Sequence, residues 1–239
     1  MIKYLIIQSF VGNGTWWNDH ENLDDLYNNI LIPSVAKYCN KYGYKHVVYR
    51  DQYDLINIVN LKSKTTFGNL YHQYLSALKH QDEDVDYIVF MDSDFYITNT
   101  ARPLVQTKHI KGNVWTEEQV VLWSRGKDPK TFTTVMGGIQ IVKKEVAINL
   151  AEYMKSRLID YIVNNSPMTL MPDEVTIGEW MGKYNIKPEK LSQYYNWLLE
   201  DIRDRPWSDE DTAAGFWHFC GDRKAEKLAY LLEHIDRLE

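Results

Sequence analysis

The sequence predicts an α/β protein built on a parallel, doubly wound sheet, and three observations support this. Short apolar strands alternate with helices through the first hundred residues, which is typical of a parallel sheet with helices on both faces. The strand predicted at Asp86–Met91 consists almost wholly of β-branched, aromatic and other apolar residues, as in a strand buried on both faces. Two carboxylates, Asp92 and Asp94, follow that strand directly.

The elements of the first half are predicted from apolar spacing and from the residues that end each run. An acidic turn connects the helix predicted at Asn69–Lys79 to the Asp86–Met91 strand. In chain order these elements are a strand at Lys3–Ser9, a helix at Leu23–Tyr42, a strand at Lys45–Tyr49, a helix at Asn69–Lys79 and the strand at Asp86–Met91.

The pattern changes after Asp94, and the elements of the second half are shorter. Glycines in the Val135–Val142 strand indicate a bulge or a close approach of another group to the backbone. Arg203–Asp211 is predicted to be a loop. The other predicted elements are a strand at Phe95–Thr98, extended material at Asn113–Ser124, helices at Lys144–Val163 and Glu174–Lys183, short strand or turn material at Lys190–Leu199, a strand at Phe216–Cys220 and a helix at Asp222–Leu238.

The composition is that of an ordinary globular protein. The 239 residues suffice for one large α/β domain, and 44% are hydrophobic and 25% charged. A net charge of −6 argues against a nucleic-acid partner, which requires a basic surface. Cys39 and Cys220 have no metal-like spacing, and no apolar run reaches membrane-spanning length. We therefore expect a cytoplasmic protein whose membrane association, if any, is peripheral.

Asp92 and Asp94 form an Asp-x-Asp triplet at the end of the predicted central strand. Ligand sites in open α/β sheets lie beyond the carboxyl ends of the strands, which is where these carboxylates stand. Residues two apart in an extended segment point to the same side, and two nearby carboxylates repel unless a cation lies beside them. Hard oxygen ligands of this kind suit Mg²⁺ or Mn²⁺. The alternative is a pair of solvated turn residues, because aspartate is common in turns.

The segment from His218 to Lys224 brings together residue types suited to a diphosphate. It lies where a predicted strand meets a helix, and a helix N-terminus presents unpaired amides to an anion. Gly221 lets an anion approach the backbone, Lys224 adds a positive charge and His218 can complete a metal shell. The alternative for His218 is a buried imidazole with a structural hydrogen bond.

Together these features resemble the GT-A fold glycosyltransferases. The shared pattern is an Asp-x-Asp after a buried strand, a later Gly-Gly strand, an acidic pair that opens a helix and a terminal His-x-x-Gly-x-x-Lys. The likeness is greatest to the retaining family 8 enzymes, of the glycogenin and lipopolysaccharide galactosyltransferase type, and runs from Tyr4 to Leu231. It implies a single domain over residues 1–239 with a Rossmann-like, mixed, mostly parallel sheet flanked by helices. Residues 1–98 would form the nucleotide-binding half and residues 99–239 the acceptor half.

The resemblance also implies roles for individual residues. Asp92, Asp94 and His218 are expected to bind a metal ion, Mn²⁺ in preference to Mg²⁺ because one ligand is an imidazole. Lys224 is expected to contact the diphosphate of a nucleotide sugar donor. The other expected donor-binding residues are Gly221, Ser93 between the two aspartates, and Phe10, Gly12 and Asn13 in the loop after the first strand.

The chain departs from family 8 at two places. Met136-Gly137-Gly138 stands where that family has Asn-Ser/Ala-Gly, and Asp173-Glu174 stands where it has Asp-Gln. Both features resemble retaining family 6, whose glutamate is the candidate nucleophile but which lacks the terminal His/Lys motif. Glu174, with Asp173 second, is therefore the expected catalytic anion; the alternative is helix capping. The aromatic segment Tyr194–Trp197 is expected to line the sugar or acceptor side.

The predicted function is transfer of a sugar, with retention, from a UDP-type donor to a hydroxyl of a glycan, lipid-linked or protein-linked acceptor. A haloacid dehalogenase-type phosphatase is the alternative enzyme, because its apolar strand also ends in Asp-x-Asp. That motif usually lies on the first strand and has Thr or Val two residues after the second Asp, where this chain has Tyr96. A sugar-nucleotide-binding protein without catalysis is the third candidate. The donor sugar and the acceptor stay open.

Overall fold

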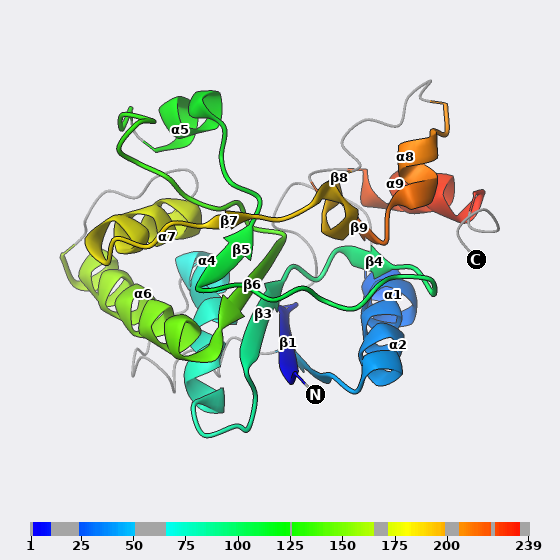
Figure 1. Cartoon of the computed structure of the whole chain (residues 1–239), viewed down its shortest axis with the longest axis horizontal. Helices are drawn as coiled ribbons and strands as arrows, with labels where there is room; N and C mark the ends of the chain where they lie inside the picture. Colours follow the sequence, from blue (N-terminus) through cyan, green and yellow to red (C-terminus); the bar gives the residue numbers. More distant parts are fainter. Residues whose placement is uncertain are drawn as a thin grey trace.

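A six-stranded mixed sheet lies at the centre of the computed structural model, which describes residues 2–10, 24–50, 66–124, 126–164, 172–198, 206–220 and 223–234 (Figure 1). In chain order its strands are β1 (Tyr4–Ser9), β2 (Lys45–Tyr49), β3 (Tyr87–Met91), β5 (Ile110–Gly112), β6 (Ile139–Lys143) and β7 (Glu189–Lys190). In space their order is β2-β1-β3-β6-β5-β7. Strand β1 is parallel to β2 and to β3, and β7 is parallel to β5. Strand β6 is antiparallel to both of its neighbours.

A small second sheet brings the last strand of the chain beside the segment that follows Asp94. It consists of β4 (Phe95–Ile97), β8 (Trp197–Leu198) and β9 (Phe216–His218), in the order β4-β9-β8. Strands β4 and β9 are antiparallel, and Phe95 is paired with His218. Strand β9 thereby ends next to the carboxyl end of β3, although well over a hundred residues separate the two in sequence.

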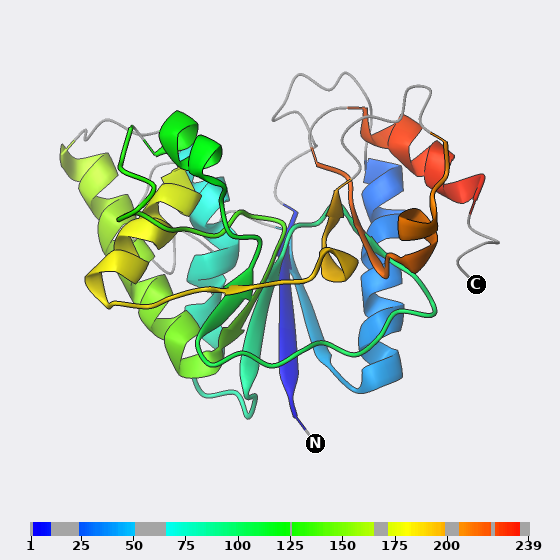
Figure 2. The ribbon, with the colours of Figure 1, turned by 45° about the horizontal axis from the view of Figure 1, so that its top comes forward.

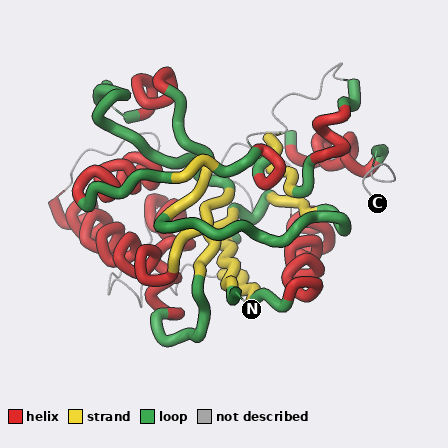
Figure 3. The backbone as a smooth tube through the Cα atoms, viewed as in Figure 1, coloured by secondary structure: helices red, strands yellow, loops and turns green. Residues whose placement is uncertain are grey.

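Helices cover both faces of the central sheet (Figures 2 and 3). One face is covered by α4 (Thr66–Leu75), α6 (Lys144–Asn164) and α7 (Pro172–Lys183). The other side carries a continuous helix made of α1 (Asp24–Leu26), a π-helical turn (Tyr27–Leu31) and α2 (Ile32–Tyr42), together with the small sheet. The remaining helical segments are two 3₁₀ turns at Ser76–His80 and Gln193–Tyr195, and the helices α5 (Glu117–Trp123), α8 (Asp209–Ala213) and α9 (Lys224–Leu232).

The strand β3 is buried on both faces, as its apolar run predicts. Ile88 and Phe90 pack into the cluster that includes residues of α4, α6 and α7. Val89 and Met91 point to the opposite face and pack with residues of α2 and the small sheet. Successive side chains along a strand alternate between faces, so only a strand with helices or strands on both sides accepts an uninterrupted apolar sequence.

The sequence prediction of the fold is confirmed in its main features, an α/β fold with a mixed, mostly parallel sheet, and wrong in two segments. Asn113–Ser124, predicted to be extended, contains the helix α5, which begins after a capping box formed by Thr116 and Gln119. The predicted loop Arg203–Asp211 contains the start of α8, which is capped by Ser208. Both helices are too short to show an apolar period, and only their caps mark them in the sequence.

The antiparallel pairs of the mixed sheet lie in the second half of the chain. Strand β6 begins only at Ile139, after the two glycines, and runs against β3. The upstream part of the predicted strand contributes a single bridge between Val135 and Val114. Residues of this region and of α5 form a separate apolar cluster over the start of α7: Trp115, Val120, Phe132, Val175 and Met136.

Two glycines of α7 provide a test of how this cluster packs. A Cβ built at Gly178 would lie 2.3 Å from the Phe132 ring, whereas nothing lies within 4 Å of a Cβ at Gly182. We expect Gly178→Ala to lower the free energy of unfolding by about 1–3 kcal/mol, because the ring must move. The control Gly182→Ala should leave it unchanged or raise it by up to about 1 kcal/mol, because alanine favours helix. Equal effects in urea denaturation would contradict the described contact.

Candidate functional site

The two aspartates and His218 come together at the carboxyl end of β3. The backbone N–H of Asp92 donates to the carbonyl of Gly138 (2.7 Å), which extends the pairing of β3 with the chain that leads into β6. The N–H of Phe219 donates to the carbonyl of Asp94 (3.0 Å), which extends the pairing of β4 with β9. Asp92 is thus fixed to the central sheet and Asp94 to the small sheet, and the site lies where the two sheets meet.

The imidazole of His218 faces both carboxylates, as the sequence predicts. Its Nε2 lies 3.3 Å from Asp94 Oδ1 and 3.7 Å from Asp92 Oδ2. One ligand atom from each residue lies within 4.8 Å of the others. The side chains of His218 and Asp94 are almost completely buried, while that of Asp92 is 37% exposed. The group is therefore open to solvent on the side of Asp92.

Neighbouring residues fix the orientation of the Asp92 carboxylate. Its Oδ2 accepts from the backbone N–H of Gly138 (2.8 Å) and its Oδ1 from Gln73 Nε2 (3.2 Å). Gly138 has a φ of +86°, and a Cβ there would lie 2.9 Å from the His218 ring. Glycine at this position thus allows both a backbone conformation that other residues avoid and the close approach of the imidazole.

The two carboxylates differ in their electrostatics. Burial, with the adjacent charge of Asp94, raises the pKa of Asp92 from 3.8 to about 6. Burial also acts to raise the pKa of Asp94, but the Lys224 ammonium and His218 outweigh it and hold that pKa well below its usual value. The Asp94 charge is therefore compensated by Lys224, and the Asp92 charge has only partial compensation.

The residues present fit a divalent cation. Two carboxylates and an imidazole converge, and Asp94 Oδ1 is buried without a hydrogen-bond partner in the described part of the chain. Burial and the charge of Asp94 both disfavour the ionised form of Asp92 and raise its pKa, and a cation beside the two carboxylates would favour that form. Oxygen ligands with one imidazole suit Mn²⁺.

Lys224 and two aromatic residues adjoin the carboxylates. The Lys224 ammonium forms an ion pair with Asp94 Oδ2 and donates to the carbonyl of Phe219 (2.9 Å). The Tyr27 hydroxyl interacts with Lys224, and the Phe10 ring stacks on Tyr27 with centroids 4.4 Å apart. The guanidinium of Arg50 lies over the Phe10 ring, 5.3 Å from its centroid. The sequence analysis missed Tyr27, because its helical spacing shows only that it faces the interior.

Asp173 and Glu174 lie in the first turn of α7, close to Asp92. Glu174 Oε1 accepts from the backbone N–H of Gly137 (3.2 Å), and Oε2 is buried without a hydrogen-bond partner in the described residues. A Cβ built at Gly137 would lie 3.4 Å from Glu174 Oε1 and 3.5 Å from Asp92 Oδ2, so both carboxylates flank this glycine. Burial and the neighbouring Glu174 raise the pKa of Asp173 well above its usual value. An acidic pair thus adjoins the metal-ligand group.

Of the other predicted site residues, some lie in the described part of the chain and some outside it. Ser93 lies between the aspartates and is half-buried, while Gly12, Asn13 and Gly221 lie outside the described residues. In the aromatic segment, the hydroxyl of Tyr194 accepts from the N–H of Arg102 (2.7 Å), and that of Tyr195 donates to the carbonyl of Pro103 (2.7 Å). These two tyrosines pack the small sheet against the chain at 101–105, whereas Asn196 reaches His218.

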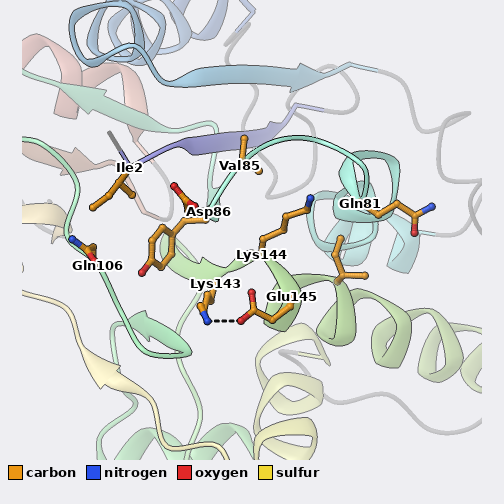
Figure 4. A pocket seen from close by; sticks show the side chains of 10 residues that line it. Ile2, Gln81, Val85, Asp86, Gln106, Lys143, Lys144 and Glu145 are labelled. Carbon is orange, nitrogen blue, oxygen red and sulfur yellow. Dashed lines mark ion pairs between the residues drawn. The ribbon is translucent and has the colours of Figure 1, made fainter.

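A hollow at the opposite edge of the sheet is a less suitable site (Figure 4). It lies at the amino end of β3, about 17 Å from the aspartates given the rise of a strand. Its charged side chains are engaged with one another or with backbone: Lys143 pairs with Glu145 (2.6 Å), and Asp86 accepts from the N–H of Lys3 (2.7 Å).

No helix within the described ranges is long and apolar enough to cross a bilayer.

Comparisons with known proteins agree with this geometry. No protein-family model and no curated protein matches the sequence. The structure resembles a glycosyltransferase involved in the glycosylation of the major capsid of PBCV-1, with a TM-score of 0.58 and 16% identity over 98% of both chains. It also resembles mouse xyloside xylosyltransferase 1 in its apo form, with a TM-score of 0.51 and 12% identity over 92% of this chain and 98% of that one. The chain therefore has the GT-A fold of these glycosyltransferases, along nearly its whole length.

Proposed function

We propose that this protein is a metal-dependent glycosyltransferase that moves a sugar from a nucleotide diphosphate sugar to a hydroxyl acceptor with retention. The observation that carries the proposal is the convergence of Asp92, Asp94 and His218 at the carboxyl end of the central strand of a GT-A fold. A UDP-hexose is the proposed donor and Mn²⁺ the proposed ion. The acceptor class is a carbohydrate or a carbohydrate-bearing lipid or protein.

The chain's own residues have distinct parts in this proposal. Asp92, Asp94 and His218 would hold the cation, whose positive charge would offset the negative charge that develops on the departing diphosphate. Lys224, which pairs with Asp94, would add a second positive charge to the same phosphate oxygens; its contact with a metal ligand supports this role. Phe10 and Tyr27 form an aromatic face beside Lys224, suited to the base of the nucleotide.

Glu174 is the proposed catalytic anion, with Asp173 as its neighbour. A sugar that loses its diphosphate develops positive charge at the anomeric carbon, and an anion on the opposite side can stabilise that charge or bind the sugar covalently before the acceptor replaces it, which gives retention. The buried oxygen Oε2 of Glu174 has no hydrogen-bond partner in the described chain, so its lone pairs are available to a ligand. The glycine at position 137 leaves space between this carboxylate and Asp92.

The phosphatase alternative has less support. The strand that ends in the Asp-x-Asp is the third strand in the described part of the chain, and the fold matches glycosyltransferases. A binding protein without catalysis would use the same site, so only turnover separates it from the enzyme.

The test is a donor screen with the purified protein. We expect a UDP-sugar to raise the melting temperature in the presence of Mn²⁺ and to release UDP slowly, with both effects lost in EDTA. Stabilisation by UDP-sugars without turnover, alone or with a panel of glycan acceptors, would favour the binding protein. Hydrolysis of p-nitrophenyl phosphate without any nucleotide binding would favour the phosphatase, and no response to any of these ligands would refute the proposal.

A further inference from the structure

We propose that Asn196 is a positioning residue of the metal site, which holds the imidazole of His218 with Nε2 toward Asp92 and Asp94. The inference rests on the proposed function, since it assigns His218 as a ligand of the cation. It concerns a residue that touches neither the cation nor the two carboxylates.

The hydrogen bond between the two side chains determines which nitrogen can bind a metal. Asn196 Oδ1 lies 3.1 Å from His218 Nδ1, and an amide oxygen can only accept. Nδ1 therefore carries the hydrogen in this contact. Nε2, the nitrogen 3.3 Å and 3.7 Å from the aspartate oxygens, is then the one that can give its lone pair to a cation shared with them. Partners of this kind fix the tautomer of metal-binding histidines in proteins generally.

Packing alone does not orient the ring. The Phe95 ring stacks on the imidazole with centroids 4.6 Å apart and an interplanar angle of 14°. Gly138 lies against the same imidazole, since a Cβ there would be 2.9 Å from Cε1 and Nδ1. These contacts restrict the plane of the ring, yet a half-turn about Cβ–Cγ keeps that plane and exchanges Nε2 for Cε1. The hydrogen bond from Nδ1 to Asn196 distinguishes the two orientations.

The surroundings of Asn196 also indicate a role beyond packing. The residue is 3% exposed, and its Nδ2 has no hydrogen-bond partner within the described ranges. A buried amide donor without a partner costs stability, so an apolar residue would pack better at this position. The backbone holds the residue in place: its N–H donates to Gln193 (3.0 Å), and Leu198, two residues on, is paired with His218.

The experiment compares three variants by two measurements. Asn196→Ala removes the acceptor, Asn196→Asp keeps an oxygen acceptor, and Gln193→Ala alters an exposed side chain of the same turn as the control. ¹⁵N spectra of histidine-labelled protein, without metal and with diamagnetic Mg²⁺ and UDP, report whether Nδ1 of His218 carries a hydrogen, with His218→Gln identifying the signal among the seven histidines. Mn²⁺ titration in the presence of UDP gives the dissociation constant of the ion.

In the wild type and in Asn196→Asp we expect His218 to carry its hydrogen on Nδ1, and in Asn196→Ala to populate both tautomers. Mn²⁺ affinity should fall by about 10–100-fold in Asn196→Ala and stay within about threefold of wild type in the other two. An unchanged tautomer and affinity in Asn196→Ala would overturn the inference. Failure of the wild type to bind Mn²⁺ at all would instead refute the proposed function, and the tautomer alone would then support or refute the hydrogen bond assigned to Asn196.

Discussion

Asp92→Asn is expected to lower metal-dependent turnover by on the order of 10³-fold and to leave the metal-free protein as stable as wild type, or more stable, at pH 8. The raised pKa of Asp92, about 6 in the fold, means that the protonated form is favoured by folding. This contribution is fully present below the unfolded pKa near 4 and is lost as the pH rises to about 6. At pH 8 the ionised carboxylate therefore destabilises the metal-free fold; the neutral amide removes that cost, which offsets the loss of one of the two hydrogen bonds that the carboxylate accepts from Gly138 and Gln73.

Asp94→Asn is the matched comparison, because it should abolish turnover with the opposite effect on stability. The lowered pKa of Asp94 means that its charge stabilises the fold above the unfolded pKa, and that this contribution is lost as the pH falls through the folded value. Without the carboxylate the ammonium of Lys224, whose side chain is 9% exposed, stays buried and loses its ion-pair partner among the described residues. We expect a loss of about 3–5 kcal/mol of unfolding free energy in urea with EDTA at pH 8. Equal destabilisation of Asp92→Asn and Asp94→Asn would contradict the assignment of Asp94 as the carboxylate that pairs with Lys224.

Glu174→Gln is expected to lower turnover by about 10²–10³-fold with little change in UDP affinity or in stability. The amide preserves the shape of the side chain, so the contact with Gly137 is kept and only the charge is lost. Removal of that charge should lower the pKa of Asp173 in part, while burial, the larger cause, still holds that pKa above its usual range. Single-turnover release of UDP and thermal shifts with UDP separate chemistry from binding.

The control for this prediction is Asp173→Asn, which alters the neighbouring buried carboxylate. If Glu174 supplies the catalytic anion, Asp173→Asn should retain far more activity than Glu174→Gln. Turnover of Glu174→Gln within about threefold of wild type would remove Glu174 from the reaction, and a larger loss in Asp173→Asn would transfer the role to that residue.

The strands and the metal-ligand group could be predicted because their signals are local in sequence. The apolar run before Asp92 predicts a strand covered on both faces, and such strands end where ligands bind. The position of His218 followed from its place at the end of a predicted strand and from the resemblance to glycosyltransferases. The structure brings it to the aspartates through the pairing of Phe95 with His218.

The residues that orient the site could not be predicted in the same way. Gln73, Tyr27 and Asn196 contact the site from a helix, a π-helical turn and a loop, and their sequence neighbours carry no motif. Their contacts depend on how the two sheets and the helices pack. The short helices α5 and α8 were missed for a related reason, since a few residues cannot show an apolar period and only the capping residues mark them.

The central claim is that Asp92, Asp94 and His218 share one divalent cation at the meeting point of the two sheets. Crystals grown with Mn²⁺ and UDP, measured at the manganese absorption edge, test it most directly. The account predicts one anomalous peak within about 2.5 Å of a side-chain atom of each of the three residues, with diphosphate oxygens completing the shell. Bound UDP with no peak there, or a peak coordinated by other residues, would contradict it.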